Sequence, residues 1–148
     1  MTSARQPPAR ARPAGTRLAQ RPAMPTPDAR QAAGLRGEDL ACAELRRRGY
    51  AITARRYRSR YGEIDIIAER DGTIVFVEVK ARTTARRGTA AESVPAWKRR
   101  RLGAIALGWL AATHRAHARC RFDVVAIDGL GTPAETIAII ENAFQWGG

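Results

Sequence analysis

The dipeptide Asp71-Gly72 separates two runs of residues, 63–69 and 73–80, that are apolar or alternate between apolar and polar side chains. An Asp-Gly pair between two such runs is the strongest short-range signal for a two-residue β-hairpin turn, because both residues tolerate the positive φ that this turn requires. We therefore predict an antiparallel hairpin over these residues, and the rest of the chain has to pack around it.

The length of the turn determines which side chains of the hairpin face each other. Pairing continues outward from the residues that flank the turn, so Asp65 is expected opposite Glu78, and Glu63 opposite Lys80. Alternation then divides the side chains between the two faces of the hairpin. One face carries Glu63, Asp65, Ile67, Ile74, Phe76, Glu78 and Lys80, and the other carries Ile64, Ile66, Val75, Val77 and Val79.

Asp65 and Glu78 are two carboxylates that this register places where they repel each other. In a chain with a net charge of +12, such a pair on otherwise apolar strands needs compensation, and a divalent cation is a natural source of it. Two alternatives stay open. Arginine side chains neutralise the pair, or a bulge shifts the register and separates the two acids.

Lysine is rare in this chain, since only Lys80 and Lys98 occur among 26 cationic residues. A composition that uses arginine almost throughout is expected to place arginine wherever a positive charge alone suffices. An ammonium group can shift its pKa, approach a metal-bound water and donate to a developing oxyanion, whereas a guanidinium stays protonated. Lys80 is therefore a candidate catalytic residue. Lys98 either has a functional role or extends along its helix to water.

The other segments are expected to form two helices and three further strands. The helices cover residues 35–48 and 94–113, and the strands cover 51–57, 121–127 and 136–140. Gly49 is a natural end of the first helix. Glu38 shares the apolar face of that helix with Ala41, Cys42 and Leu45. The second helix has one stripe made of Lys98, Leu102, Ile105, Ala106 and Trp109.

The order of these elements predicts the fold class. The chain leaves the third strand, passes through the second helix and enters the fourth strand, and a crossover of this kind joins parallel strands. We expect an α/β fold with a mixed central sheet flanked by helices, in the order helix-strand-strand-strand-helix-strand-strand.

Residues 1–33 contain six of the eight prolines and six arginines, but no Ile, Val, Phe, Trp or Tyr. Such a segment cannot bury enough apolar surface to offset its ordering entropy. We predict a disordered basic tail over 1–33 and a single domain over 34–148. No apolar run approaches the roughly 20 residues that cross a membrane, so we expect a cytoplasmic protein without a membrane partner. The net charge predicts a polyanionic partner.

Several further residues are interpreted as structural. The two cysteines lack the spacing of a disulfide scaffold or a zinc site, so we expect reduced packing residues. Asp123 is expected to form an ion pair with Arg121, two residues earlier on the same strand. The three tryptophans are too scattered for a base-stacking platform and are expected in the core or at its edge. These residues are Cys42, Cys120, Trp97, Trp109 and Trp146.

Four short stretches, taken in order, resemble a known family. They are Gly37-Glu38-Asp39, Arg60-Tyr61-Gly62-Glu63-Ile64-Asp65, Phe76-Val77-Glu78-Val79-Lys80-Ala81-Arg82 and Arg121-Phe122-Asp123-Val124-Val125. The set is similar to the YraN-type bacterial family of the PD-(D/E)XK, restriction-endonuclease-like superfamily, which is distantly similar to archaeal Holliday junction resolvases. The resemblance covers residues 34 to about 144 and depends on the ordered set, because a short Glu-x-Lys element alone occurs by chance. Ile64-Asp65 stands where the superfamily motif has Pro-Asp.

This resemblance implies a restriction-endonuclease-like fold and a metal-dependent nuclease acting on DNA in preference to RNA, with branched or structured DNA as a candidate substrate. The implied catalytic residues are Glu38, Asp65, Glu78 and Lys80. The implied ligands of Mg²⁺ or Mn²⁺ are Asp65, Glu78, Glu38 and the carbonyl of Val79. The implied nucleic-acid contacts are Arg58, Arg60, Arg82, Arg86, Arg87 and Lys98, with Arg55 and Arg56 beside them. The resolvase similarity is compatible with a homodimer.

The residues support this chemistry on their own terms. Hard oxygen ligands select Mg²⁺ or Mn²⁺ over zinc, and such an ion can bind a phosphodiester oxygen while activating water. Two other functions stay open. One is a catalytically silent nucleic-acid-binding module, and the other is a basic accessory protein whose tail does the binding. The complete set of acids and lysine argues against a decayed site.

Overall fold

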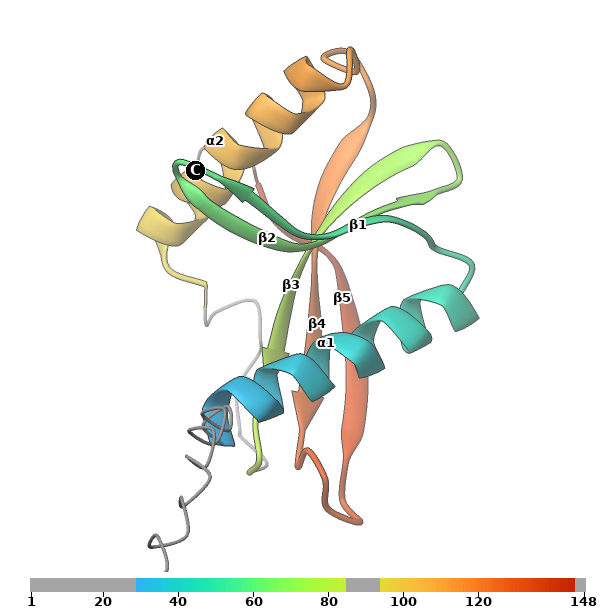
Figure 1. The fold of residues 1–148 in the computed structure, drawn as a ribbon. Helices are drawn as coiled ribbons and strands as arrows, with labels where there is room; N and C mark the ends of the chain where they lie inside the picture. The colour runs from blue at the N-terminus through green and yellow to red at the C-terminus, as the bar shows by residue number, and fades with distance from the viewer. Residues whose placement is uncertain (1–28, 85–93, 146–148) are drawn as a thin grey trace, which may run out of the picture.

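A computed structural model describes residues 29–84 and 94–145 of the chain. Its helices and strands follow each other in the predicted order (Figure 1). They are α1 (Ala29–Arg47), β1 (Ala51–Ser59), β2 (Gly62–Arg70), β3 (Thr73–Ala81), α2 (Ala96–Ala112), β4 (Cys120–Asp128) and β5 (Thr136–Phe144). Most of the predicted basic tail, and Arg86 and Arg87 as well, lie outside the described residues.

The sheet has five strands in the order β1-β2-β3-β4-β5. Neighbouring strands are antiparallel except for β3 and β4, which are parallel and are connected through α2. This confirms the predicted crossover and the mixed α/β sheet. In Figure 1 the two helices lie on opposite sides of the twisted sheet, and the packing of their side chains agrees with that arrangement.

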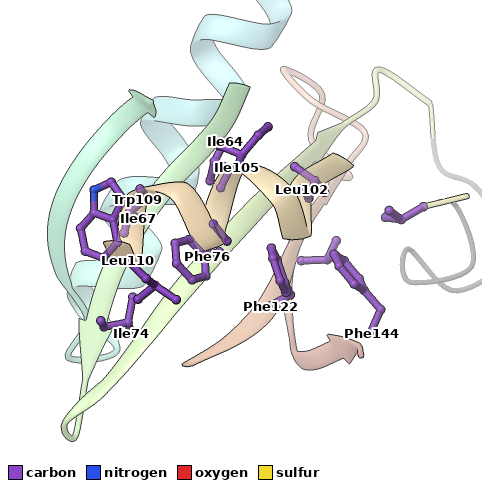
Figure 2. Close-up of a cluster of buried hydrophobic side chains, with 13 residues drawn as sticks. Ile64, Ile67, Ile74, Phe76, Leu102, Ile105, Trp109, Leu110, Phe122 and Phe144 are labelled. Atoms are coloured by element: carbon purple, nitrogen blue, oxygen red, sulfur yellow. The ribbon is translucent and has the colours of Figure 1, made fainter. Parts of the chain in front are cut away.

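Each helix covers its own hydrophobic core. The core under α2 contains Ile64, Ile67, Phe76, Leu102, Ile105, Trp109, Phe122 and Phe144 among its buried residues (Figure 2). Aromatic rings meet there edge to face and stacked, with centroids 5.8 Å apart for Phe76 and Trp109 and 4.8 Å apart for Phe122 and Phe144. The core under α1 contains Ala41, Cys42, Leu45, Ile66, Val75, Val77, Val125 and Ile127. The apolar faces predicted for both helices are confirmed.

The hairpin turn has the predicted geometry. Asp71 and Gly72 have φ values of 50° and 76°, as a two-residue turn of this type requires. Pairing runs in the predicted register from Arg70 and Thr73 to Ile66 and Val77, and beyond this pair the two strands separate.

Ile64 lies on the other face of the sheet from the one predicted. It packs in the α2-side core with Ile67, whereas Ile66 packs on the α1 side. Alternation is interrupted at Asp65. Between the pairs Arg55–Ile66 and Tyr57–Ile64, the residue of β1 that faces Asp65 is Arg56, which has a φ of 50°. The side chains of β2 therefore change face at Asp65, next to the positive φ of Arg56. The register shift of the β1–β2 ladder lies elsewhere, between Ile52 and Ala54.

Helix α1 begins at Ala29, so residues 29–33 belong to the helix and not to the predicted tail. This stretch contains alanine, arginine and glutamine and no proline, and these residues favour helix, whereas prolines interrupt the chain up to Pro27. The helix ends two residues before Gly49, whose φ is 89°. Glu38 lies on its buried face, as predicted.

Three predictions about packing residues have mixed outcomes. Both cysteines are free and pack against the cores. Trp109 is buried in the α2-side core, as predicted. Trp97 is 54% exposed, so the prediction that it packs in or beside the core is wrong. Trp146 lies outside the described residues. In the ranges that the structure describes, we find no helix long and apolar enough to span a bilayer.

Asp123 is the centre of a buried polar cluster that joins three parts of the sheet. Its carboxylate accepts hydrogen bonds from Arg121 at 2.9 Å, from the Tyr50 hydroxyl at 3.1 Å and from the backbone amide of Asn142 at 2.9 Å. This confirms the predicted ion pair and assigns Asp123 a structural position at the irregularity in the pairing of β4 and β5.

We expect Tyr50→Phe to lower the free energy of unfolding by about 1–2 kcal/mol. The lost hydroxyl donates to Asp123 and accepts from Arg70 at 3.3 Å and Arg121 at 3.2 Å, so its removal leaves partly buried polar groups with one partner fewer. Urea denaturation measures the change. Tyr57→Phe, which removes a hydroxyl outside this cluster, is the control, and equal stability of the two variants would contradict the expectation.

Candidate active site

The strands β2 and β3 separate at the residues predicted to form the site. Their pairing ends at Ile66 and Val77, and the amide of Val79 donates a hydrogen bond to Oδ2 of Asp65 at 2.8 Å. Asp65 and Glu78 therefore lie next to the last pair of this ladder, on two neighbouring strands, but do not form a further pair.

The predicted contact between Glu63 and Lys80 does not form. Glu63 instead binds Arg58 at 2.9 Å, and the β2–β3 ladder has no pair beyond Ile66 and Val77. The ladder is in register up to that point, so the difference comes from the end of pairing and not from a shifted register between β2 and β3.

Glu78 is buried against both lysines of the chain. Its Oε1 lies 2.5 Å from Nζ of Lys98 and 3.8 Å from Nζ of Lys80. Lys98 comes from the first turns of α2, which the crossover places over the end of β3. Lys98 thus extends into the site and not along its helix to water, and lysine, not arginine, supplies the positive charge beside Glu78.

The pKa values of this cluster are shifted in different directions. Burial and then the charge of Glu78 raise the pKa of Asp65 to about 7, against the opposing effects of the Val79 amide and Lys98. Burial and then the charge of Lys98 lower the pKa of Lys80. Burial would also lower the pKa of Lys98, but the hydrogen bond and the charge of Glu78 outweigh it and raise that pKa.

A cleft of about 1010 Å³ opens beside Asp65, between the start of α1 and the ends of three strands. Its charged lining residues are three acids and three arginines, namely Glu38, Glu63 and Asp65, and Arg56, Arg58 and Arg82. Glu78 and the two lysines are not in its lining. Asp65 therefore connects the cleft to the Glu78 cluster.

Glu38 lines this cleft, and both of its carboxylate oxygens accept hydrogen bonds from arginine. Arg55 donates to Oε1 at 3.0 Å, and Arg56 donates to Oε2 at 2.9 Å. Arg55 also binds Asp39 at 2.6 Å. The charge of Glu38 still acts on Asp65, whose pKa it helps to raise. The structure thus brings Glu38 to the same cleft as Asp65, but as the partner of two arginines.

The sequence model of a family described as "Uncharacterised protein family UPF0102" matches residues 37–127, a range that includes Glu38, Asp65, Glu78 and both lysines. The chain belongs to the UPF0102 family. UPF0102 proteins of Geobacter sulfurreducens, Magnetococcus marinus and Rhodococcus opacus are 46%, 44% and 45% identical to it. These similarities cover 76%, 77% and 76% of this chain and 88%, 92% and 96% of the relatives. The resemblance to the YraN-type family, which is this family, is confirmed.

The donor set of this UPF0102 protein fits a hard cation only with help from other ligands. Among residues 29–84 and 94–145, no three His, Cys, Asp or Glu side chains lie close enough to hold a metal ion. Asp65 and Glu78 supply two adjacent carboxylates that repel each other, and this repulsion contributes to the raised pKa of Asp65. Mg²⁺ characteristically keeps several waters and binds through one or two carboxylates plus substrate phosphate. The two carboxylates suit this mode of binding.

The arginines predicted to contact nucleic acid occupy different positions in the UPF0102 fold. Arg58 and Arg82 line the cleft, whereas Arg60 lies at the tip of the β1–β2 hairpin with its guanidinium over the ring of Tyr61. Sequence reasoning did not find the pairing of Lys98 with Glu78. The available signal was that Lys98 shares the sheet-facing stripe of its helix with Leu102 and Ile105.

Proposed function

We propose that this UPF0102 protein is a Mg²⁺- or Mn²⁺-dependent nuclease that hydrolyses phosphodiester bonds of DNA, with branched or structured DNA as a candidate substrate. The observation that carries the proposal is the cluster where β2 and β3 separate, in which Asp65 and Glu78 lie beside the only two lysines of the chain. Perturbed, partly buried acids and bases next to a cleft are typical of active sites.

Each residue of this cluster would have a different role in such a reaction. Asp65 and Glu78 would hold the cation, which supplies a polarised phosphodiester and a water of lowered pKa when it is bound. The Val79 amide orients Asp65, and Lys98 orients Glu78. Lys80 has a lowered pKa, so its Nζ gives up a proton more readily than an ordinary lysine, and in the protonated form it would donate to a negatively charged phosphoryl oxygen.

Glu38 is proposed as an additional ligand that depends on substrate. Arg55 and Arg56 bind both of its oxygens, so one oxygen becomes available for a cation only when a guanidinium releases it. A phosphate group is the natural competitor, since guanidinium binds phosphate as readily as carboxylate. DNA in the cleft would therefore attract these arginines and complete the ligand set together with the carbonyl of Val79.

The charge of the chain supports a nucleic-acid partner. The net charge is +12, and arginines surround the cleft on β1 and at the end of β3. Contacts with phosphates provide affinity without reading sequence. We assign this role to Arg58, Arg60 and Arg82, and to Arg86 and Arg87 in the segment outside the described residues.

A cleavage assay on supercoiled, duplex, branched and single-stranded DNA, with RNA as a comparison, tests the proposal. We expect cutting of DNA with Mg²⁺ or Mn²⁺ and none with a chelator. No cutting of any substrate, together with intact DNA binding by the full chain, would contradict the proposal and favour a catalytically silent binding module. If binding also disappears when residues 1–28 are removed, a basic accessory protein is favoured instead.

A further inference from the structure

Two aromatic side chains on the α2 side of the molecule are exposed to solvent. Tyr61, at the tip of the β1–β2 hairpin, is 46% exposed, and Trp97, in the first turn of α2, is 54% exposed. An arginine guanidinium lies over each ring. Arg60 lies 4.8 Å from the centroid of Tyr61, and Arg101 lies 5.1 Å from that of Trp97.

The two rings belong to one surface, because the hairpin tip touches α2. Gly62, next to Tyr61, approaches the helix so closely that a β-carbon on it would lie 3.2 Å from Cδ of Arg101. Arg101 is the residue whose guanidinium covers Trp97. Figure 1 shows the tip of this hairpin beside α2.

This surface borders the candidate active site. Trp97 directly precedes Lys98, which binds Glu78 at 2.5 Å. On the hairpin, Glu63 follows Gly62 and lines the cleft next to Asp65. Each ring thus lies within two residues of a residue of the site, Trp97 beside Lys98 and Tyr61 close to Glu63.

Exposed aromatic rings beside arginines suit unpaired nucleotides better than a closed duplex. A base that has left the helix stack can lay its face on an aromatic ring while its phosphate contacts arginine, whereas the faces of paired bases are covered by their neighbours. We propose that Tyr61 and Trp97 form a base-stacking surface for unpaired nucleotides of DNA. This inference rests on the proposed function and narrows its substrate to DNA with unpaired nucleotides next to the cleaved bond.

Binding of the full chain to labelled DNA in the presence of chelator tests the surface without cleavage. The probes are a single-stranded oligonucleotide and a blunt duplex of the same sequence. We expect Trp97→Ala to weaken single-strand binding at least about fivefold, as the loss of one stacked base does, and to change duplex binding less than about twofold. Trp97→Phe retains most of the affinity, and Tyr61→Ala reproduces the selective loss. Leu107→Ala removes another exposed apolar side chain of α2, 60% exposed, and leaves both affinities unchanged.

Equal weakening on both probes, or none on either, would overturn the inference. A second copy of the chain is the competing occupant of this surface, and sedimentation of the same proteins detects it. If the wild type is a dimer and Trp97→Ala is a monomer, the surface is an interface between copies and the inference fails. A selective loss of single-strand binding in a protein that cuts no DNA would keep the stacking surface and reject only the nuclease.

Discussion

Lys80→Arg is expected to slow DNA cleavage by about 100-fold or more while leaving DNA affinity within about twofold. The variant keeps the positive charge at the end of β3, so the electrostatic attraction of phosphate changes little. It removes a group whose pKa lies below its usual range and replaces it with a guanidinium that does not give up its proton in a protein. The rate of cleavage at saturating DNA and the affinity in chelator measure the two effects separately.

The environment of Lys80 is the reason why we expect the identity of its side chain to matter, and not only its charge. Burial and the neighbouring ammonium of Lys98 lower the pKa of Lys80, and Glu78, 3.8 Å away, only partly compensates. Lys98 has the opposite shift, because it donates a hydrogen bond to Glu78 and lies next to the charge of that carboxylate. The two lysines therefore differ in their environment, since the pKa of Lys80 is lowered whereas Lys98 holds the carboxylate of Glu78.

Arg47→Lys is the matched control for this exchange of cations. Arg47 lies in the last turn of α1 with 70% of its side chain exposed, away from the cleft, and its exchange should leave cleavage unchanged. Equal melting temperatures of wild type and Lys80→Arg show that the fold is intact. If the folded Lys80→Arg protein cuts DNA at the wild-type rate, a positive charge is all that the site needs, and the catalytic role of Lys80 has to be abandoned.

Local sequence signals predicted most of the fold for identifiable reasons. The Asp71-Gly72 turn has a narrow set of allowed φ values, and it determines the register of five residue pairs. Periodic apolar residues predicted the buried faces of both helices, and the crossover through α2 fixed the parallel pairing of β3 with β4. Each of these signals operates within one element or between consecutive ones.

The parts of the site that the sequence did not predict depend on contacts between distant elements. The pairing of β2 with β3 ends before Asp65, and β1 next to it has a positive φ at Arg56. A register argument made on the β2–β3 hairpin alone does not include this third strand. The burial of Glu38 was predicted, but its two arginine partners come from β1. Likewise, the exposure of Trp97 follows from where α2 meets the hairpin tip, which the helix periodicity alone does not give.

Asp65→Asn is expected to stabilise the metal-free protein at pH 8 and to leave its stability nearly unchanged at pH 4. The carboxyl of Asp65 has its pKa raised from 3.8 to about 7 in the folded protein, by burial and by the charge of Glu78. The amide of asparagine stays neutral at both pH values, and its oxygen can still accept the hydrogen bond of the Val79 amide. Thermal unfolding in chelator measures the difference.

The sign of this effect follows from proton binding. Between pH 4 and 7 the folded protein keeps a proton on Asp65 that the unfolded chain has lost, so the wild type loses stability as the pH rises through this window. Above pH 7 the loss is complete and constant. The difference between a pKa of 3.8 and one of about 7 corresponds to at most about 4 kcal/mol, and partial access of water to Asp65 reduces that amount.

A bound cation should reverse the order of stability of the wild type and Asp65→Asn, because it stabilises the wild type by binding only its folded state. Mg²⁺ or Mn²⁺ at pH 8 is therefore expected to raise the melting temperature of the wild type and not that of Asp65→Asn. Asp71→Asn is the control. Its side chain is 93% exposed in the hairpin turn, so it should change neither the pH profile nor the response to metal. An equal metal response in wild type and Asp65→Asn would exclude Asp65 as a ligand, and equal stability of the two at pH 8 in chelator would contradict its raised pKa.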